Sequence, residues 1–222
     1  MIVPSVDYHL HTVHCGHSDE AMTVANVIRE AEAMGLEEIA FLEHVDSPEQ
    51  KGLVARIRGE VERARPRLRV LVGAECALAQ RWPPEPGFIP PDADFVGFSI
   101  HHHPTTQVPH WERPGFADDV RDRIYDAWFT AVRTVLVEHD VDLFCHPFFA
   151  MPIGGIILNY AGAFVESARP VLDVMAERGV AFELNGTMPL KNPEGMLLGY
   201  LDLVREAKRA GVKFSVGSVR CV

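Results

Sequence analysis

Histidine and glutamate residues recur at or next to the ends of short apolar runs along this chain of 222 residues. His9 and His11 stand two residues apart, so in an extended strand both side chains point the same way. Two imidazoles side by side on one strand are a natural clamp for a divalent metal ion. Residues of the same ligand type follow at the ends of later runs: His44, Glu75, His101 and His146. Burying so many imidazoles together without a metal would leave nitrogens unpaired, so we expect a metal centre.

The elements that must position these residues alternate along the chain. Seven short runs rich in Val, Ile, Leu and Phe have the character of buried parallel strands. These runs are Ser5–His9, Glu38–His44, Arg69–Cys76, Asp94–His101, Val141–His146, Val180–Asn185 and Val212–Gly217. Helical patterns separate most of them, at Thr23–Met34, Pro48–Arg65, Phe116–His139, Ala163–Arg178 and Pro193–Ala210. Thr23 and Asn192 are suitable N-caps, and Gly35, Gly179 and Gly211 are expected to end helices.

Strands that alternate with helices predict a single α/β domain with a parallel sheet. The sheet could be a closed barrel or an open, doubly wound sheet. The first run is followed by no glycine-rich phosphate loop, and nearly every run ends in a polar residue of ligand type. Because the carboxyl ends of barrel strands converge on one face, this pattern favours a barrel similar to a TIM barrel. The proline-rich segment Ala77–Pro91 is expected to be a loop over the strand ends.

Composition narrows the class of protein. The net charge of −10 argues against binding to long nucleic acids, which requires basic residues against the phosphates. The chain has 47% hydrophobic residues, enough for a core, yet it contains no apolar run long enough to span a membrane. The N-terminal residues lack the features of a signal peptide, so we expect a cytoplasmic protein. The oligomeric state is left open, and a homo-oligomer is compatible with the sequence.

The four cysteines show no CxxC pairing, so we do not expect a fold held together by disulfide bonds. Cys76 and Cys145 are each adjacent to a candidate ligand, Glu75 and His146. Because neighbours on a strand face opposite ways, we expect both cysteines in the helix layer as small buried hydrophobic residues.

Other residues could complete the site. Asp7 could orient a ligand imidazole, or it could simply be a turn residue at the start of its strand. Alternation places His103 on the side of His101 if that strand continues. Lys191 and Arg220 lie in loops on the strand-end face, where they could bind a substrate anion or be ordinary surface charges.

The ordered set of motifs resembles the PHP (polymerase and histidinol phosphatase) family. The set runs Asp7-x-His9-x-His11-Thr12, His17-Ser18, Glu43-His44, Glu75, His101 and His146-Pro147. The segments Tyr8-His9-x-His11-Thr12, Gly35-Leu36-Glu37-Glu38-Ile39 and Glu183-Leu184-Asn185 are most similar to the histidinol-phosphatase-like branch. The resemblance implies a distorted (β/α)7 barrel with two to three divalent ions, zinc, manganese or iron. It implies metal ligands at His9, His11, His17, His44, Glu75, His101 and His146, with Glu75 bridging two ions. Among these motif residues, Asp7, His17 and Glu75 are the candidates for catalysis.

The last motif departs from the family pattern. The family's final strand ends in Gly-Ser-Asp-x-His, whose Asp and His bind metal, whereas this chain has Gly217-Ser218-Val219-Arg220-Cys221. Val219 cannot bind metal, and Cys221 could bind zinc as a thiolate. We expect residues 1–222 to form one domain whose last barrel strand lies at the C-terminus without a closing helix. Three explanations of this departure remain open: an altered or truncated terminus, completion of the site by another chain, or a divergent protein with fewer metals.

The resemblance therefore predicts a metal-dependent phosphoesterase. Its expected substrate is a small phosphomonoester, attacked by a metal-activated hydroxide. One alternative is a phosphodiesterase or exonuclease that acts on nucleotides. Another is a degenerate barrel that binds metal or a partner without turnover. An amidohydrolase barrel also carries His-x-His on its first strand, but it typically has eight strands and a carboxylated lysine. Here we count seven strands and no lysine at a strand end.

The double substitution Val219→Asp and Cys221→His should strengthen metal retention and raise kcat, because both positions would regain the family's ligands. Metal content per chain and turnover of an aryl phosphate measure the two effects. If neither changes, our alignment of the last strand with the family motif is wrong.

Overall fold

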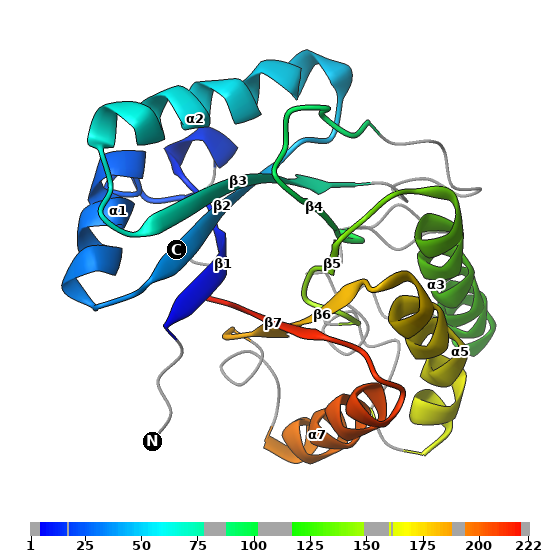
Figure 1. Cartoon of the computed structure of the whole chain (residues 1–222). Coiled ribbons are helices and arrows are strands. Elements are labelled where there is room, and N and C mark those ends of the chain that lie inside the picture. Colours follow the sequence, from blue (N-terminus) through cyan, green and yellow to red (C-terminus); the bar gives the residue numbers. More distant parts are fainter. Residues whose placement is uncertain are drawn as a thin grey trace.

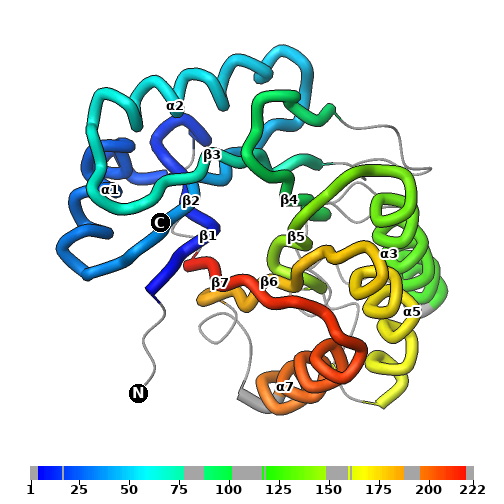
Figure 2. The backbone as a smooth tube through the Cα atoms, viewed as in Figure 1, coloured from blue at the N-terminus to red at the C-terminus, as the bar shows by residue number. Residues whose placement is uncertain are grey.

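The computed structural model describes residues 5–16, 18–77, 88–101, 117–148, 160, 162–187 and 194–218. Its centre is a sheet of seven parallel strands that follow one another in sequence order. The strands are β1 (Val6–Leu10), β2 (Glu38–His44), β3 (Arg69–Cys76), β4 (Val96–Phe98), β5 (Leu143–Phe144), β6 (Ala181–Asn185) and β7 (Phe214–Gly217). β7 returns to contact β1, so the sheet forms a nearly closed barrel (Figures 1 and 2). The predicted barrel is confirmed, and the open sheet is excluded.

Helices surround the strands on the outside of the barrel (Figure 1). They are η1 (Val13–Cys15), α1 (Val24–Ala33), η2 (Pro48–Lys51), α2 (Gly52–Ala64), α3 (Asp118–Glu138), α5 (Ala163–Arg178) and α7 (Glu194–Arg209). The Thr23 hydroxyl accepts a hydrogen bond from the Asn26 amide and so caps α1, as the sequence predicts. Gly179 ends α5 with a φ of 73°, a left-handed conformation that a side chain would disfavour. The expected cap at Asn192 lies outside the described residues.

Strands β4 and β5 are shorter than the runs that predict them. Just before each of these strands, an aspartate side chain accepts a hydrogen bond from the backbone of the neighbouring strand. Before β4, Asp94 Oδ2 accepts from the Val72 amide at 2.7 Å. Before β5, Asp142 Oδ2 accepts from the Val96 amide at 2.8 Å. At the end of β5, His146 has a φ of 32°, which ends the extended conformation. His101 and His146 therefore lie just beyond their strands rather than within them.

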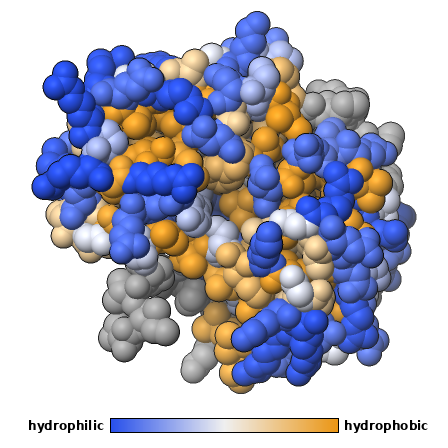
Figure 3. Space-filling model, in the orientation of Figure 1, coloured by the Kyte–Doolittle hydropathy of each residue, from blue (hydrophilic) through white to orange (hydrophobic). Residues whose placement is uncertain are grey.

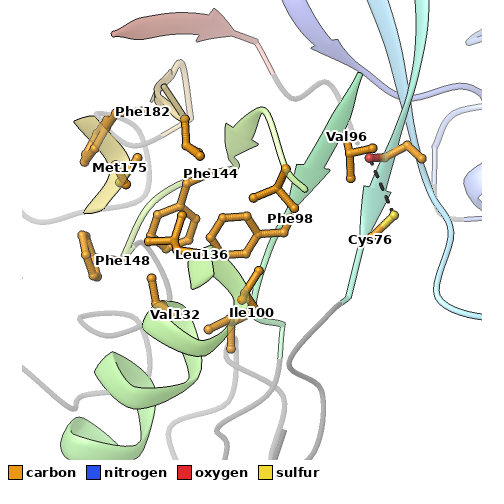
Figure 4. Packing of buried hydrophobic residues seen from close by; sticks show 14 of the residues in the cluster. Cys76, Val96, Phe98, Ile100, Val132, Leu136, Phe144, Phe148, Met175 and Phe182 are labelled. Carbon is orange, nitrogen blue, oxygen red and sulfur yellow. Dashed lines mark hydrogen bonds between the residues drawn. The ribbon is translucent and has the colours of Figure 1, made fainter. Parts of the chain in front are cut away.

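Aromatic packing stabilises the barrel wall around these two short strands. The rings of Phe98 and Phe144 stack with their centres 4.5 Å apart, close to Val132 and Leu136 of α3 (Figure 4). Phe148 contacts Phe144 and also Phe164 of α5, at ring centres 5.4 and 5.3 Å apart. Burial of each large ring contributes roughly 1.5–3 kcal/mol, so packing rather than strand length holds this part of the sheet.

A second, smaller cluster contains Leu42, Leu143 and Cys145. Leu42 alternates along β2 with Phe41, which belongs to the large core cluster, so Leu42 faces the inside of the barrel. Cys145 therefore points inward, and our expectation that it lies in the helix layer is wrong. The reason is the positive φ at His146, which breaks the alternation between these two neighbours. Cys76 does join the large core cluster, as expected.

On the face that Figure 3 shows, hydrophilic residues cover the outer helices and hydrophobic residues gather toward the middle. No helix in the described part of the chain combines the length and apolar character that crossing a bilayer requires.

The seam between β7 and β1 depends on one carboxylate and one glycine. Asp7 Oδ1 accepts hydrogen bonds from the His9 amide at 3.2 Å and from the Ser218 amide at 3.0 Å. A Cβ atom at Gly217 would lie 2.5 Å from the Cβ of His9, so only glycine allows β7 to approach this closely. The first and last strands thus meet through the Asp7 side chain and through tight backbone packing.

The substitution Asp7→Ala should lower the free energy of unfolding by about 1–3 kcal/mol, because two backbone N–H groups lose their acceptor. Urea unfolding measures the change. Asp7→Asn is the matched control, since its amide oxygen can still accept, and it should lose clearly less stability. Equal stability of the alanine variant and the unchanged chain would contradict this role for Asp7.

Candidate metal centre

Five imidazoles form a closed ring at the carboxyl ends of the strands. His9 belongs to β1, His11 follows it, His44 ends β2, and His101 and His146 follow β4 and β5. Each ring contacts the next, with centroid separations of 4.7 to 5.9 Å. The contacts run His9–His11, His11–His44, His44–His101, His101–His146 and His146–His9. The structure therefore brings together five histidines that are spread over 138 positions of the sequence.

Glu75 of β3 stands inside this ring with no exposed surface. Its two oxygens face different imidazoles. Oε2 lies 3.1 Å from His9 Nε2, 3.6 Å from His11 Nε2 and 3.5 Å from His44 Nδ1. Oε1 lies 3.0 Å from His146 Nε2 and 3.4 Å from His101 Nε2. One carboxylate thus separates two groups of nitrogen donors, which is the arrangement expected of a bridging ligand.

The local backbone explains how the ligands reach Glu75. The register of β2 and β3 pairs His44 directly with Glu75. His146 and Phe148 both adopt positive φ angles, 32° and 60°, which are uncommon for residues other than glycine. The His146 amide donates to Glu183 Oε2, which holds this turn in place. The His146 side chain is thereby directed at Glu75 instead of continuing along the strand.

The donor set fits divalent metal ions. The ligand atoms of His9, His11 and Glu75 lie within 4.8 Å of one another, and so do those of His44, Glu75 and His101. The Nε2 atoms of His9 and His11 are 3.1 Å apart. Two nitrogens bound tetrahedrally at about 2.0 Å from one zinc ion would be separated by about 3.3 Å. Imidazole and carboxylate ligands suit zinc, manganese and iron alike.

The electrostatics of the ring are consistent with a cation. Burial raises the pKa of Glu75, but His44 and His9 outweigh burial and hold this pKa well below its usual range. Burial lowers the pKa of His9, yet the carboxylates of Glu183 and Glu75 raise it well above the usual value. The buried carboxylates therefore require positive charge nearby. A dication can supply that charge in place of protons on the imidazoles.

Two buried glutamates behind the imidazoles were not among the site residues that the sequence predicts. Glu183 of β6 contacts His9 Nδ1 through Oε1 at 2.7 Å. Glu43 of β2 accepts from the Thr12 amide, and its Oε2 lies 4.0 Å from His11 Nδ1. Burial raises the pKa of Glu43 to about 7. The available signals were the motifs Glu43-His44 and Glu183-Leu184-Asn185 at predicted strand ends. Sequence alone could not connect either glutamate to a particular imidazole.

Of the remaining predicted site residues, the structure describes Asp7. Asp7 lies near the site, but its carboxylate accepts from the backbone amides of His9 and Ser218. Glu183 has the contact with a candidate ligand imidazole that was one of the two roles open to Asp7. The other predicted site residues lie outside the described residues: His17, His103, Lys191, Arg220 and Cys221.

The fold and this cluster define a class of proteins, the parallel barrels with a histidine and glutamate centre at the strand ends. The sequence matches the PHP domain over residues 7–187, and the chain belongs to the PHP family.

Solved structures resemble the fold. A Listeria monocytogenes protein provisionally named histidinol phosphatase HisK has a TM-score of 0.60 at 15% sequence identity, over 96% of this chain and 94% of that one. A structure of archaeal ribonuclease P with mature tRNA gives a TM-score of 0.49 at 13% identity, over 96% of this chain and 73% of that one. No curated protein sequence matches the chain. At 15% identity the likeness to the Listeria monocytogenes structure concerns the fold alone.

Glu75→Gln should reduce metal binding at both halves of the centre, because the two oxygens face different histidines. His146→Ala should weaken one half and leave the group around His9 and His11 largely intact. Elemental analysis after equilibration with zinc measures bound ions per chain. Retention of the full metal content by Glu75→Gln would show that Glu75 is not the bridging ligand.

Proposed function

We propose that this PHP protein is a metal-dependent phosphoesterase that hydrolyses a small phosphomonoester. The observation that carries the proposal is the division of imidazoles between the two oxygens of Glu75. Two adjacent cation positions joined by one carboxylate suit the attack of water on a phosphoester. Membership of the PHP family supports the same class of reaction.

The residues of this chain would hold the ions as two groups. His9 and His11 would bind one ion together with Glu75 Oε2, and His101 and His146 would bind the other together with Oε1. His44 lies 3.5 Å from Oε2 and also contacts His101, so it stands between the groups. When bound, the metal ions would activate a water molecule and offset negative charge on the phosphoryl oxygens.

The exposure of the imidazoles indicates from which side a substrate would enter. His9 and His11 are buried and form the base of the centre. The side chains of His44, His101 and His146 keep 17%, 16% and 11% of their surface exposed. A phosphoryl group would therefore approach over these three histidines, while the buried base keeps bulk water away from Glu75.

Further contacts with the phosphoryl group are assigned to residues outside the described part of the chain. We propose His103, Lys191 and Arg220 for contacts with the phosphoryl group, because these side chains can donate hydrogen bonds to anionic oxygens. His17 is proposed as a further metal ligand and Cys221 as a zinc ligand. The net charge of −10 favours a small substrate over a polynucleotide.

An aryl phosphate monoester should be hydrolysed by protein purified without chelator, since the proposed site needs only metal and a phosphoryl group. Chelation should abolish turnover, and added zinc or manganese should restore it. Glu75→Gln should reduce the rate to background. Glu177→Gln is the control, because Glu177 is exposed on α5.

The alternatives give different results in the same assay. Faster hydrolysis of an aryl phosphodiester than of the monoester would favour the phosphodiesterase function. Metal binding without turnover of either ester would indicate a barrel that has lost catalysis. Activity that survives both chelation and Glu75→Gln would contradict the proposed centre.

A further inference from the structure

Glu183 joins two candidate metal ligands that come from different strands. It is fully buried in β6, and each of its oxygens has a separate partner. Oε1 lies 2.7 Å from His9 Nδ1, and Oε2 accepts a hydrogen bond from the His146 amide. The side-chain NH2 group of Asn185 also donates to Oε2, at 3.4 Å. His9 stands on the Oε2 side of Glu75 and His146 on the Oε1 side, so Glu183 contacts both halves of the centre.

The hydrogen-bond chemistry requires an acceptor at both positions. The His146 amide can only donate, so the atom facing it must accept. His9 Nε2 points at Glu75 Oε2 and His11 Nε2, both 3.1 Å away, where a metal ion would need its lone pair. The proton of neutral His9 must then be on Nδ1, and the atom facing Nδ1 must accept as well. Of the common side chains of this length, only a carboxylate offers two acceptors.

We propose that Glu183 is a positioning residue for the metal centre. It selects the Nδ1–H tautomer of His9 with one oxygen and fixes the backbone turn that presents His146 with the other. This inference rests on the proposed metal-dependent function, and it adds a residue that holds ligands without binding the metal. Outer carboxylates of this kind typically contribute a factor of about 10–100 to metal affinity.

Glutamine has nearly the same shape as glutamate but cannot replace it here. If the amide oxygen faces His9, the NH2 group meets the N–H of His146, and two donors oppose each other. If the amide is turned round, the NH2 group donates to His9 Nδ1 and moves the imidazole proton to Nε2. In that tautomer Nε2 has no lone pair with which to bind a metal ion. Glu183→Gln is therefore disruptive in either orientation.

The last strand makes room for this carboxylate. A Cβ atom at Gly217 would overlap Glu183 Oε1. The register of β6 and β7 pairs Asn185 with Gly217 and Glu183 with Ser215, which brings the two strands together at this point. A Cβ atom at Gly217 would also lie 2.5 Å from the Cβ of His9, so Gly217→Ala would disturb the ligand and the carboxylate together.

Zinc affinity of the whole chain, measured by competition with a chromophoric chelator, tests the proposal. Glu183→Gln should bind zinc about 10–100-fold more weakly than the unchanged chain. Glu177→Gln is the matched control and should bind normally. Thermal unfolding of each metal-free variant checks that the fold is retained.

The state of the His9 ring in the zinc-loaded protein is a second readout. Spectra of ¹⁵N-histidine-labelled, zinc-loaded protein should show His9 protonated at Nδ1 and bound to the metal ion through Nε2. This pattern should be lost for His9 in Glu183→Gln, whereas a merely structural role would leave it unchanged.

The two readouts separate this inference from the proposed function. If the unchanged chain binds zinc and Glu183→Gln binds it equally tightly, the inference is overturned. If the unchanged chain binds neither zinc nor manganese, the proposed function fails, and the inference that rests on it fails as well. If both chains bind zinc and the His9 signals are the same in Glu183→Gln, only the inference is rejected.

Discussion

The negative charge of a buried carboxylate must be balanced by hydrogen-bond donors or by positive charge. Glu75 is fully buried, and imidazoles surround its carboxylate. This requirement constrains the whole chain, because the five imidazoles come from four separate segments. A parallel barrel meets the requirement, since the carboxyl ends of all its strands converge on one face. The barrel and the candidate metal centre therefore follow from the same arrangement of the backbone.

The two halves of the barrel are stabilised differently. β2 and β3 pair over seven residues, so the ladder itself places His44 beside Glu75. β4 and β5 are very short, and here the stacked rings of Phe98 and Phe144 hold the wall. Short strands leave the following residues free to turn, as the positive φ at His146 shows. Packing in the helix layer thus permits an irregular backbone at the strand ends, where ligands must be aimed individually.

Membership of the PHP family and the geometry around Glu75 support the same chemistry from independent directions. The described residues supply two groups of ligands around one carboxylate. His17 lies outside the described residues, as do positions 219 and 221 of the altered last motif.

Strand order, the bounds of β2 and β3, and the identity of the clustered histidines were all predictable, because they depend on local periodicity and on residue type at strand ends. The partners of those histidines were not. Glu183 reaches His9 across 174 positions of the sequence, and Asp7 bonds to the amide of Ser218 across 211. The positive φ at His146 breaks the alternation with Cys145, so that both side chains lie on the inner side. Periodicity reports which residues share a face of one element. The pairing of buried carboxylates with particular imidazoles depends on how closely separate strands approach, and that is decided when the barrel closes.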